Sequence, residues 1–181
     1  MSSITRTAPD YTTLPTALLP IAKSHLRIDG SYDDDYITDA IKRAINWFER
    51  VTNVTVNPTT WSWLPDQGSF VCNRAAVPVS PVNSFTVDAA GADVSANYAV
   101  ETMSTHGIGL YALVGAWVSG IAVDILSGYD DAASLDPGIE DIILRYTGHL
   151  YANREILVAG TDAATPGWMN DVVATYWMPR A

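Results

Sequence analysis

Apolar residues recur at helical spacing between positions 32 and 52, and this is the clearest pattern in the chain. The residues of the repeat are Ile37, Ile41, Ala44, Ile45, Phe48 and Val51. Residues spaced three and four apart share one face of an α-helix. Ser31 is of a type that caps helices, and the acidic residues 33–35 suit the positive end of the helix dipole. The pattern predicts a helix over about 32–52 that buries one face.

Two more helices are predicted from similar repeats. The first covers about 16–27 and ends at Asp29-Gly30, where the chain can turn. Its apolar face is formed by Leu18, Leu19, Ala22 and Leu26. The other covers about 137–158 and begins at Asp136-Pro137, an N-cap residue followed by proline at the first helical position. Its buried stripe is Ile139, Ile142, Ile143, Tyr146, Leu150 and Leu157.

Between the second and third helices the pattern changes to short β-rich pieces that Gly, Pro and Asn residues interrupt. The pieces cover residues 59–64, 69–73, 84–88, 98–101, 110–114 and 121–126. Runs of this kind, bounded by turn residues, are typical of antiparallel strands. Trp61 and Trp63 share one face of the first strand, in the core or, less favoured, at an interface. We predict an α+β fold, mainly a helical bundle, with a small antiparallel β-sheet (about 59–126) inserted between the second and third long helices.

A chain of 181 residues fits one domain, and we expect that core domain over 16–158. Residues 1–15 are polar, contain two prolines and lack periodicity, so we expect a flexible arm that orders against a partner. A linker and a C-terminal segment follow over 159–181, with a short amphipathic helix from Pro166 to about Trp177.

The stretch from Gly107 to Val123 is apolar enough to be weighed as a membrane span. No charged residue occurs between Glu101 and Asp124, but no basic residue flanks the stretch and glycines interrupt it, so buried strands are the better interpretation. The first residues lack the apolar core of a signal peptide, and a single cysteine, Cys72, excludes an intramolecular disulfide. We therefore expect synthesis in a cytoplasm and no membrane partner.

Carboxylates outnumber cations two to one. Ten Lys and Arg stand against twenty Asp and Glu, which gives a formal charge of -10, and no Lys or Arg occurs over 75–144. This balance repels phosphate and disfavours a protein that grips DNA. On the third helix Asp141 and Arg145 have the favourable order for an ion pair, whereas Arg154 and Glu155 could pair within the helix or across a subunit boundary.

The chain lacks the groupings of residues that catalysis requires. His25, His106 and His149 are scattered, and neither HExxH nor GxSxG occurs. The acidic run 29–35 does not follow the order of an EF-hand loop, so a role in starting the helix is the better interpretation. Gly107-Ile-Gly109 lacks the third glycine of a dinucleotide fingerprint. We expect no enzyme activity, no catalytic residues, no cofactor and no metal site.

Several sequence pieces, taken in order, resemble the gp6-like head-tail connector family of tailed bacteriophages and phage-like particles. The opening pieces are Ala22-Lys-Ser-His-Leu-Arg-Ile-Asp-Gly30, the acidic stretch Tyr32 to Tyr36, and Trp47-Phe-Glu-Arg-Val-Thr52. The later pieces are Thr60-Trp61, Val77-Pro-Val-Ser-Pro-Val82, Ile121 to Gly128-Tyr129, and His149-Leu-Tyr-Ala-Asn-Arg-Glu155. The resemblance covers roughly residues 17–177, and it departs from the family in the longer N-terminal arm and the Trp-containing C-terminal segment.

The resemblance implies a structural virion protein at the head-tail interface. Such an adaptor forms a homo-oligomeric ring, usually a dodecamer, beneath the portal protein, with a stopper or tail protein below it and double-stranded DNA passing through. Two other functions remain open. The chain could be another morphogenetic protein, such as a stopper or tail-completion subunit, or a small phage enzyme or inhibitor.

Two candidate surfaces follow from the connector interpretation. The candidate portal interface is Trp168, Met169, Tyr176, Trp177, Met178 and Arg180, because related connectors use this end and these residue types are enriched at interfaces. Folding of the same segment onto its own bundle is the alternative. The candidate acidic surface of the DNA channel is Asp130, Asp131 and Asp136.

Overall fold

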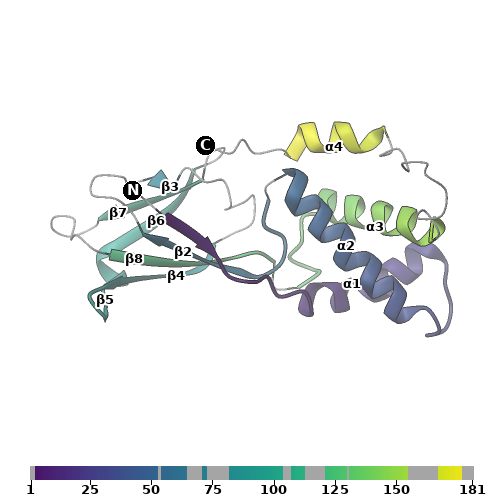
Figure 1. Cartoon of the computed structure of the whole chain (residues 1–181), viewed down its shortest axis with the longest axis horizontal. Coiled ribbons are helices and arrows are strands. Elements are labelled where there is room, and N and C mark those ends of the chain that lie inside the picture. Colours follow the sequence, from purple (N-terminus) through teal and green to yellow (C-terminus); the bar gives the residue numbers. More distant parts are fainter. Residues whose placement is uncertain are drawn as a thin grey trace. The chain divides into compact units, whose positions relative to one another are not determined.

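The chain forms two compact units, one of strands and one of helices (Figure 1). This is a computed structural model, and it describes residues 3–52, 54–64, 71–72, 82–103, 107–112, 121–129, 131–154 and 167–176. The sheet unit consists of Met1–Asp10, Asn53–Tyr129 and Met178–Ala181, and the helical unit of Tyr11–Thr52 and Asp130–Trp177. Each unit thus combines segments that are distant in sequence.

The helical unit holds four helices: α1 (Thr13–Leu26), α2 (Asp34–Thr52), α3 (Pro137–Ala152) and α4 (Trp168–Tyr176). The predicted apolar stripes meet in its core, where α2 contacts each of the other three. Fully buried side chains there are Leu14, Leu18, Ile37, Ile41, Ile45, Phe48, Ile139, Ile143 and Met169. The α+β class and the inserted sheet are confirmed, since the main strands lie between α2 and α3 in the chain.

Two helix ends differ from the prediction. α1 begins at Thr13 and not at 16, because the Thr16 hydroxyl and amide both donate to the Thr12 carbonyl oxygen and close an earlier turn. α3 ends at Ala152 and not at 158. The backbone amide and the side-chain amide of Asn153 both donate to the His149 carbonyl oxygen and close the last turn. Residues 155–158 lie outside the described residues.

The turn after α1 adopts a left-handed conformation at Arg27, one position after the helix ends. Arg27 has φ 56° and ψ 44°, and its amide donates to Ser24 while the Ile28 amide donates to Lys23. These bonds satisfy carbonyl groups that the last helical turn leaves open. The chain therefore turns at an arginine, ahead of the glycine that the sequence suggested.

The sheet unit contains two antiparallel sheets. The five-stranded sheet has the order β1-β2-β8-β4-β5, and the three-stranded sheet has the order β3-β7-β6. The strands are β1 (Ser3–Arg6), β2 (Thr59–Leu64), β3 (Val71–Cys72), β4 (Val82–Ala89), β5 (Ala92–Asp93), β6 (Tyr98–Met103), β7 (Gly107–Ala112) and β8 (Ile121–Ser127). A short 3-10 turn, Ser95–Asn97, precedes β6.

Strands β2 and β8 pair in the middle of the five-stranded sheet and bury one face. Trp61 and Trp63 on β2 are 9% and 2% exposed, and Val123 and Ile125 on β8 are fully buried. The core interpretation of the two indoles is therefore confirmed. β7 and β8 also lie where the sequence predicted strands in the apolar stretch, and the described residues include no helix long and apolar enough to cross a membrane.

Part of the N-terminal segment expected to be a flexible arm forms an edge strand. β1 pairs antiparallel with β2 from Ser3 opposite Leu64 to Arg6 opposite Trp61. Thr7 extends the pairing, because its amide donates to the Thr60 carbonyl oxygen and the Thr60 amide donates to the Thr7 hydroxyl. The segment is thus held on the chain's own sheet.

The helical core makes a stability prediction. Ile45→Ala or Ile143→Ala should each lower the free energy of unfolding by about 2 to 5 kcal/mol, because both side chains are fully buried and alanine leaves a cavity. Chemical unfolding of each variant measures the loss. Asn46→Ala, an exposed change next to Ile45, is the matched control. An unchanged midpoint in both isoleucine variants would contradict the core assignment.

Candidate functional site

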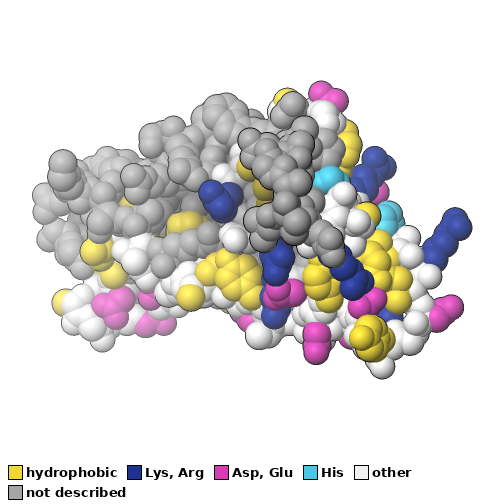
Figure 2. Space-filling view, turned by 45° about the vertical axis from the view of Figure 1, so that its right-hand side comes forward, with side chains coloured by type: hydrophobic (Ala, Val, Ile, Leu, Met, Phe, Trp, Pro, Cys, Tyr) yellow, Lys and Arg dark blue, Asp and Glu magenta, His cyan; other side chains and the backbone are white. Residues whose placement is uncertain are grey.

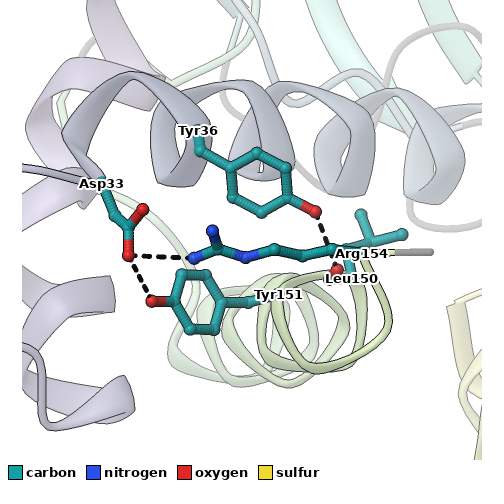
Figure 3. A network of polar contacts seen from close by, with 5 residues as sticks. All are labelled: Asp33, Tyr36, Leu150, Tyr151 and Arg154. Carbon is teal, nitrogen blue, oxygen red and sulfur yellow. Dashed lines mark hydrogen bonds and ion pairs between the residues drawn. The ribbon is translucent and has the colours of Figure 1, made fainter.

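Four side chains join the start of α2 to the end of α3, and we call them the Arg154 cluster: Asp33, Tyr36, Tyr151 and Arg154 (Figure 3). One oxygen of Asp33, Oδ2, accepts hydrogen bonds from Arg154 Nη2 at 2.9 Å and from the Tyr151 hydroxyl at 2.6 Å. Asp33 immediately precedes α2, whereas Tyr151 and Arg154 lie at the end of α3 and just after it. The cluster therefore links two helices that are distant in sequence.

The guanidinium group of Arg154 lies against two tyrosine rings. Its central carbon is 4.4 Å from the ring centre of Tyr36 and 4.2 Å from that of Tyr151. The two rings meet edge to face, with centres 5.9 Å apart, and the Tyr36 hydroxyl donates to the Leu150 carbonyl oxygen at 3.1 Å. A planar guanidinium can stack on aromatic rings and donate to a carboxylate at the same time, which lysine cannot do. The site requires arginine.

Hydrogen bonds within the cluster shift the pKa values of Asp33, Tyr151 and Arg154. Hydrogen bonds from Arg154, and then from Tyr151, hold the pKa of Asp33 below its usual value. The same bond from Arg154 to Asp33 raises the pKa of Arg154, and the bond to Asp33 raises the pKa of Tyr151. At neutral pH the cluster is therefore an ion pair with a neutral tyrosine.

A second ion pair connects the start of α2 to α1. Lys23 Nζ lies 2.6 Å from Asp34 Oδ1, and the two side chains are 21% and 30% exposed. Two of the three consecutive acidic residues, Asp33 and Asp34, thus pair with cations that lie outside α2. The acidic start of α2 fixes neighbouring helices in addition to its favourable position at the helix dipole.

A row of aromatic side chains lines α2 and α3 on a partly exposed face. The ring centres of Trp47 and Tyr146 are 4.7 Å apart, and His149 stacks on Tyr146 at 6.2 Å with the planes 10° apart. Burial raises the pKa of the Tyr146 hydroxyl. His149 thus packs against an aromatic side chain of its own helix.

The structure describes three of the six candidate portal residues, and all three lie on α4. Met169 is 1% exposed, and Trp168 is half-buried. Tyr176 packs edge to face on Phe48 with ring centres 5.7 Å apart, and its hydroxyl lies 3.4 Å from Asp136 Oδ1. Burial, followed by the charge of Asp136, raises the pKa of Tyr176. α4 thus packs on its own helical unit.

The other three candidate portal residues, Trp177, Met178 and Arg180, lie outside the described residues. Met169 is buried, so of the three described candidates Trp168 and Tyr176 present surface on α4.

The candidate acidic residues have local partners. Asp131 is exposed, and hydrogen bonds from the Ser134 amide and hydroxyl lower its pKa. Asp136 is half-buried and caps α3, accepting from the amides of Gly138 at 2.8 Å and Ile139 at 3.2 Å. Asp130 lies outside the described residues. Of the two described carboxylates, Asp131 alone is well exposed to solvent.

Charges of both signs are mixed on the visible surface. Figure 2 shows Lys and Arg side chains scattered among Asp and Glu, with no broad basic patch among the described side chains on that face. Within the described part of the chain, no three His, Cys, Asp or Glu side chains gather as metal ligands would. The described groups hold helices together and offer no arrangement of nucleophile, base and oxyanion donors.

Sequence reasoning found part of this site. The ion pair between Asp141 and Arg145, 2.8 Å long, is confirmed. Arg154, however, pairs with Asp33, which immediately precedes α2. Asp33 and Arg154 both fall in the sequence pieces that resemble the connector family. The sequence alone does not indicate that these two residues form a pair.

Comparison with known proteins gives one family match. Residues 16–80 match the family described as phage gp6-like head-tail connector protein. This segment covers α1, α2, β2 and β3, and it includes Asp33 and Tyr36 of the Arg154 cluster. No curated protein matches the chain.

Solved structures of gene transfer agent particles contain chains of the same fold. A chain from the neck of an empty particle, computed with C6 symmetry, is 19% identical with a TM-score of 0.66, and one from a native virion is 17% identical with a TM-score of 0.68. A third, from the neck of a native particle computed with C12 symmetry, is 15% identical with a TM-score of 0.64. Each match covers 100% of this chain and 97% of the other.

The Arg154 cluster predicts a change of stability in acid. Because the folded state lowers the pKa of Asp33 below 3.8, its contribution is present at neutral pH and is lost as the pH falls through the folded-state value. Asp33→Asn should therefore destabilise the protein at about pH 7, with the deficit shrinking below about pH 4. Denaturant unfolding of both proteins across this range measures the difference.

The matched control is Asp35→Asn, which removes an exposed carboxylate two residues away. At neutral pH, Asp35→Asn should lower the free energy of unfolding less than Asp33→Asn does. A deficit of Asp33→Asn that stays constant down to about pH 2 would contradict the ion-pair assignment.

Proposed function

We propose that this chain, whose residues 16–80 match the phage gp6-like head-tail connector family, is a structural connector subunit in the neck of a phage or phage-like particle. The single observation that carries the proposal is this family match on α1 and α2. The shared fold over the whole chain supports it, because the similar chains come from neck and virion structures of gene transfer agents. The matched family is a structural one, so the proposed role is not enzymatic.

The proposed assembly is a ring of identical subunits that surrounds the DNA path beneath the portal. Two of the similar neck structures were computed with C6 and C12 symmetry, which supports a symmetric ring. A ring built from one chain needs a heterologous contact whose rotation closes. The dodecamer expected from the sequence resemblance stays our proposal for the number of subunits.

An acidic channel wall suits the passage of DNA. The formal charge of -10 gives a ring of these subunits a net negative charge, which repels phosphate. We propose Asp130, Asp131 and Asp136 as part of that wall. Asp131 supports it best, since it is exposed, whereas Asp136 also caps α3.

The portal contact is proposed at the C-terminal segment. Trp177, Met178 and Arg180 follow α4 directly, and tryptophan, methionine and arginine are enriched at protein interfaces. The surface that Trp168 and Tyr176 expose on α4 would adjoin them. A stopper or tail protein would bind the opposite end of the ring.

Assembly with the portal tests this function. The full chain should form a ring-sized complex when mixed with portal, measured by light scattering after size exclusion. Deleting residues 177–181 should abolish the complex but leave the unfolding midpoint unchanged, since Met169 and the contact between Tyr176 and Phe48 remain.

Deleting residues 168–181 is the comparison. It removes the buried Met169 and should lower the free energy of unfolding by about 2 kcal/mol or more. Normal portal binding after loss of 177–181 would withdraw Trp177, Met178 and Arg180 from the interface. No assembly of the full chain with portal would reject the connector function.

Weak DNA binding is a separate expectation. Free subunits should bind duplex DNA weakly even at low salt, because few cations are available to replace the counterions on phosphate. Fluorescence anisotropy with labelled duplex at about 50 and 200 mM salt measures affinity and salt slope. In assembled rings, Asp131→Lys should raise DNA affinity more than Asp35→Lys, which makes the same charge change at another exposed site. Tight, steeply salt-dependent binding of free wild-type subunits would contradict the prediction.

A further inference from the structure

The first strand lies at the edge of the sheet that it joins. β1 is the edge strand of the five-stranded sheet, and β2 is its neighbour in the strand order. Its four residues are held by backbone pairing from Ser3 opposite Leu64 to Arg6 opposite Trp61. The exposed Thr5 contributes nothing to the buried core. An edge strand pairs through its backbone with one neighbouring strand only, so the same strand of another molecule can take its place.

The pairing continues beyond the strand in a form specific to this sequence. The Thr7 amide and hydroxyl donate to the Thr60 carbonyl oxygen at 3.0 and 2.8 Å, and the Thr60 amide donates to the Thr7 hydroxyl at 3.2 Å. The Asp10 amide donates to the Pro58 carbonyl oxygen at 3.1 Å. Residues 3–10 therefore form one bonded segment along residues 58–64.

The connection of this segment to its acceptor strand is indirect. Residues 3–10 belong to the sheet unit, but Tyr11–Thr52 belong to the helical unit, and the chain returns to the sheet unit only afterwards. No short loop therefore joins β1 to its own β2.

We propose that, in the assembled ring, residues 3–10 of each subunit pair with β2 of a neighbouring copy of the same chain. This inference rests on the ring of the proposed function. The occupant is a second copy because its residues 3–10 reproduce every bond described above, including the reciprocal pair between Thr7 and Thr60. Exchange of an identical element adds no new contact to the sheet, and it links neighbouring subunits.

The exchange would also give the ring its direction. Each subunit donates one strand and accepts one, so the contact is heterologous and propagates head to tail until the ring closes. After exchange the acceptor β2 keeps a paired strand on its outer edge.

Cysteine cross-linking between different chains tests the exchange. Thr5 and Ser62 are directly opposite in the pairing of β1 with β2, and cross-strand neighbours have Cβ atoms about 4.5 to 5.5 Å apart, close to disulfide geometry. Two proteins are made in a Cys72→Ala background, one with Thr5→Cys and the other, carrying a size tag, with Ser62→Cys. They are mixed, assembled with portal and oxidised.

Exchange predicts a disulfide between tagged and untagged chains in rings, and none between unassembled subunits at the same total concentration. A chain that carries both cysteines should close on itself before assembly and give a ladder of covalent multimers after it. The control pair Thr86→Cys and Asp124→Cys, opposite on β4 and β8 inside the sheet, should close only within one chain.

The outcomes separate the two hypotheses. Rings of normal size that give no disulfide between chains, with the double-cysteine chain closing only on itself, overturn the exchange and leave the connector function intact. Failure to form rings overturns both. Cross-chain disulfides that form equally in unassembled subunits would also overturn the proposal, because they would show contact without ring-dependent exchange.

Discussion

Burial of one face of α2 is the interaction on which the helical unit depends. Ile37, Ile41, Ile45 and Phe48 are fully buried, and α2 contacts α1, α3 and α4. Burying large aliphatic and aromatic side chains stabilises a fold by about 1.5 to 3 kcal/mol each, more than an exposed ion pair contributes. The polar groups at the helix ends then select one arrangement among those that hydrophobic burial allows. Asp33 with Arg154, Lys23 with Asp34, and Tyr176 with Asp136 are all contacts of this kind.

The same division of roles explains how an acidic protein keeps its helices together. Asp33 and Asp34 each pair with a cation that lies outside α2, and Asp136 is used as a helix cap. Carboxylates with partners of this type do not repel one another as free charges do. Exposed carboxylates such as Asp131 contribute most to the negative electrostatic potential near an approaching phosphate.

The sequence predicted the elements that carry strong local patterns. The stripe of α2, the capped start of α3 and strands β2 and β8 lie where the periodicity indicates, because burial imposes its period directly on the sequence. β1 and β5 were missed, since four and two residues are too few to show an alternation and their stability comes from a paired strand. The Arg154 cluster was missed for a related reason. Asp33 and Arg154 meet only when α2 and α3 pack, and the sequence shows each charge without its partner.

The helical unit is assembled from two parts of the chain that the strands separate. α1 and α2 precede β2 to β8, whereas α3 and α4 follow them. During synthesis the apolar face of α2 stays without α3 until the last third of the chain has been made. Contacts between residues so far apart in sequence raise contact order and slow folding, and they delay completion of a cooperative core. A truncated chain that ends before α3 would therefore expose Ile41 and Ile45, a signal that quality-control proteases and chaperones recognise in incomplete proteins.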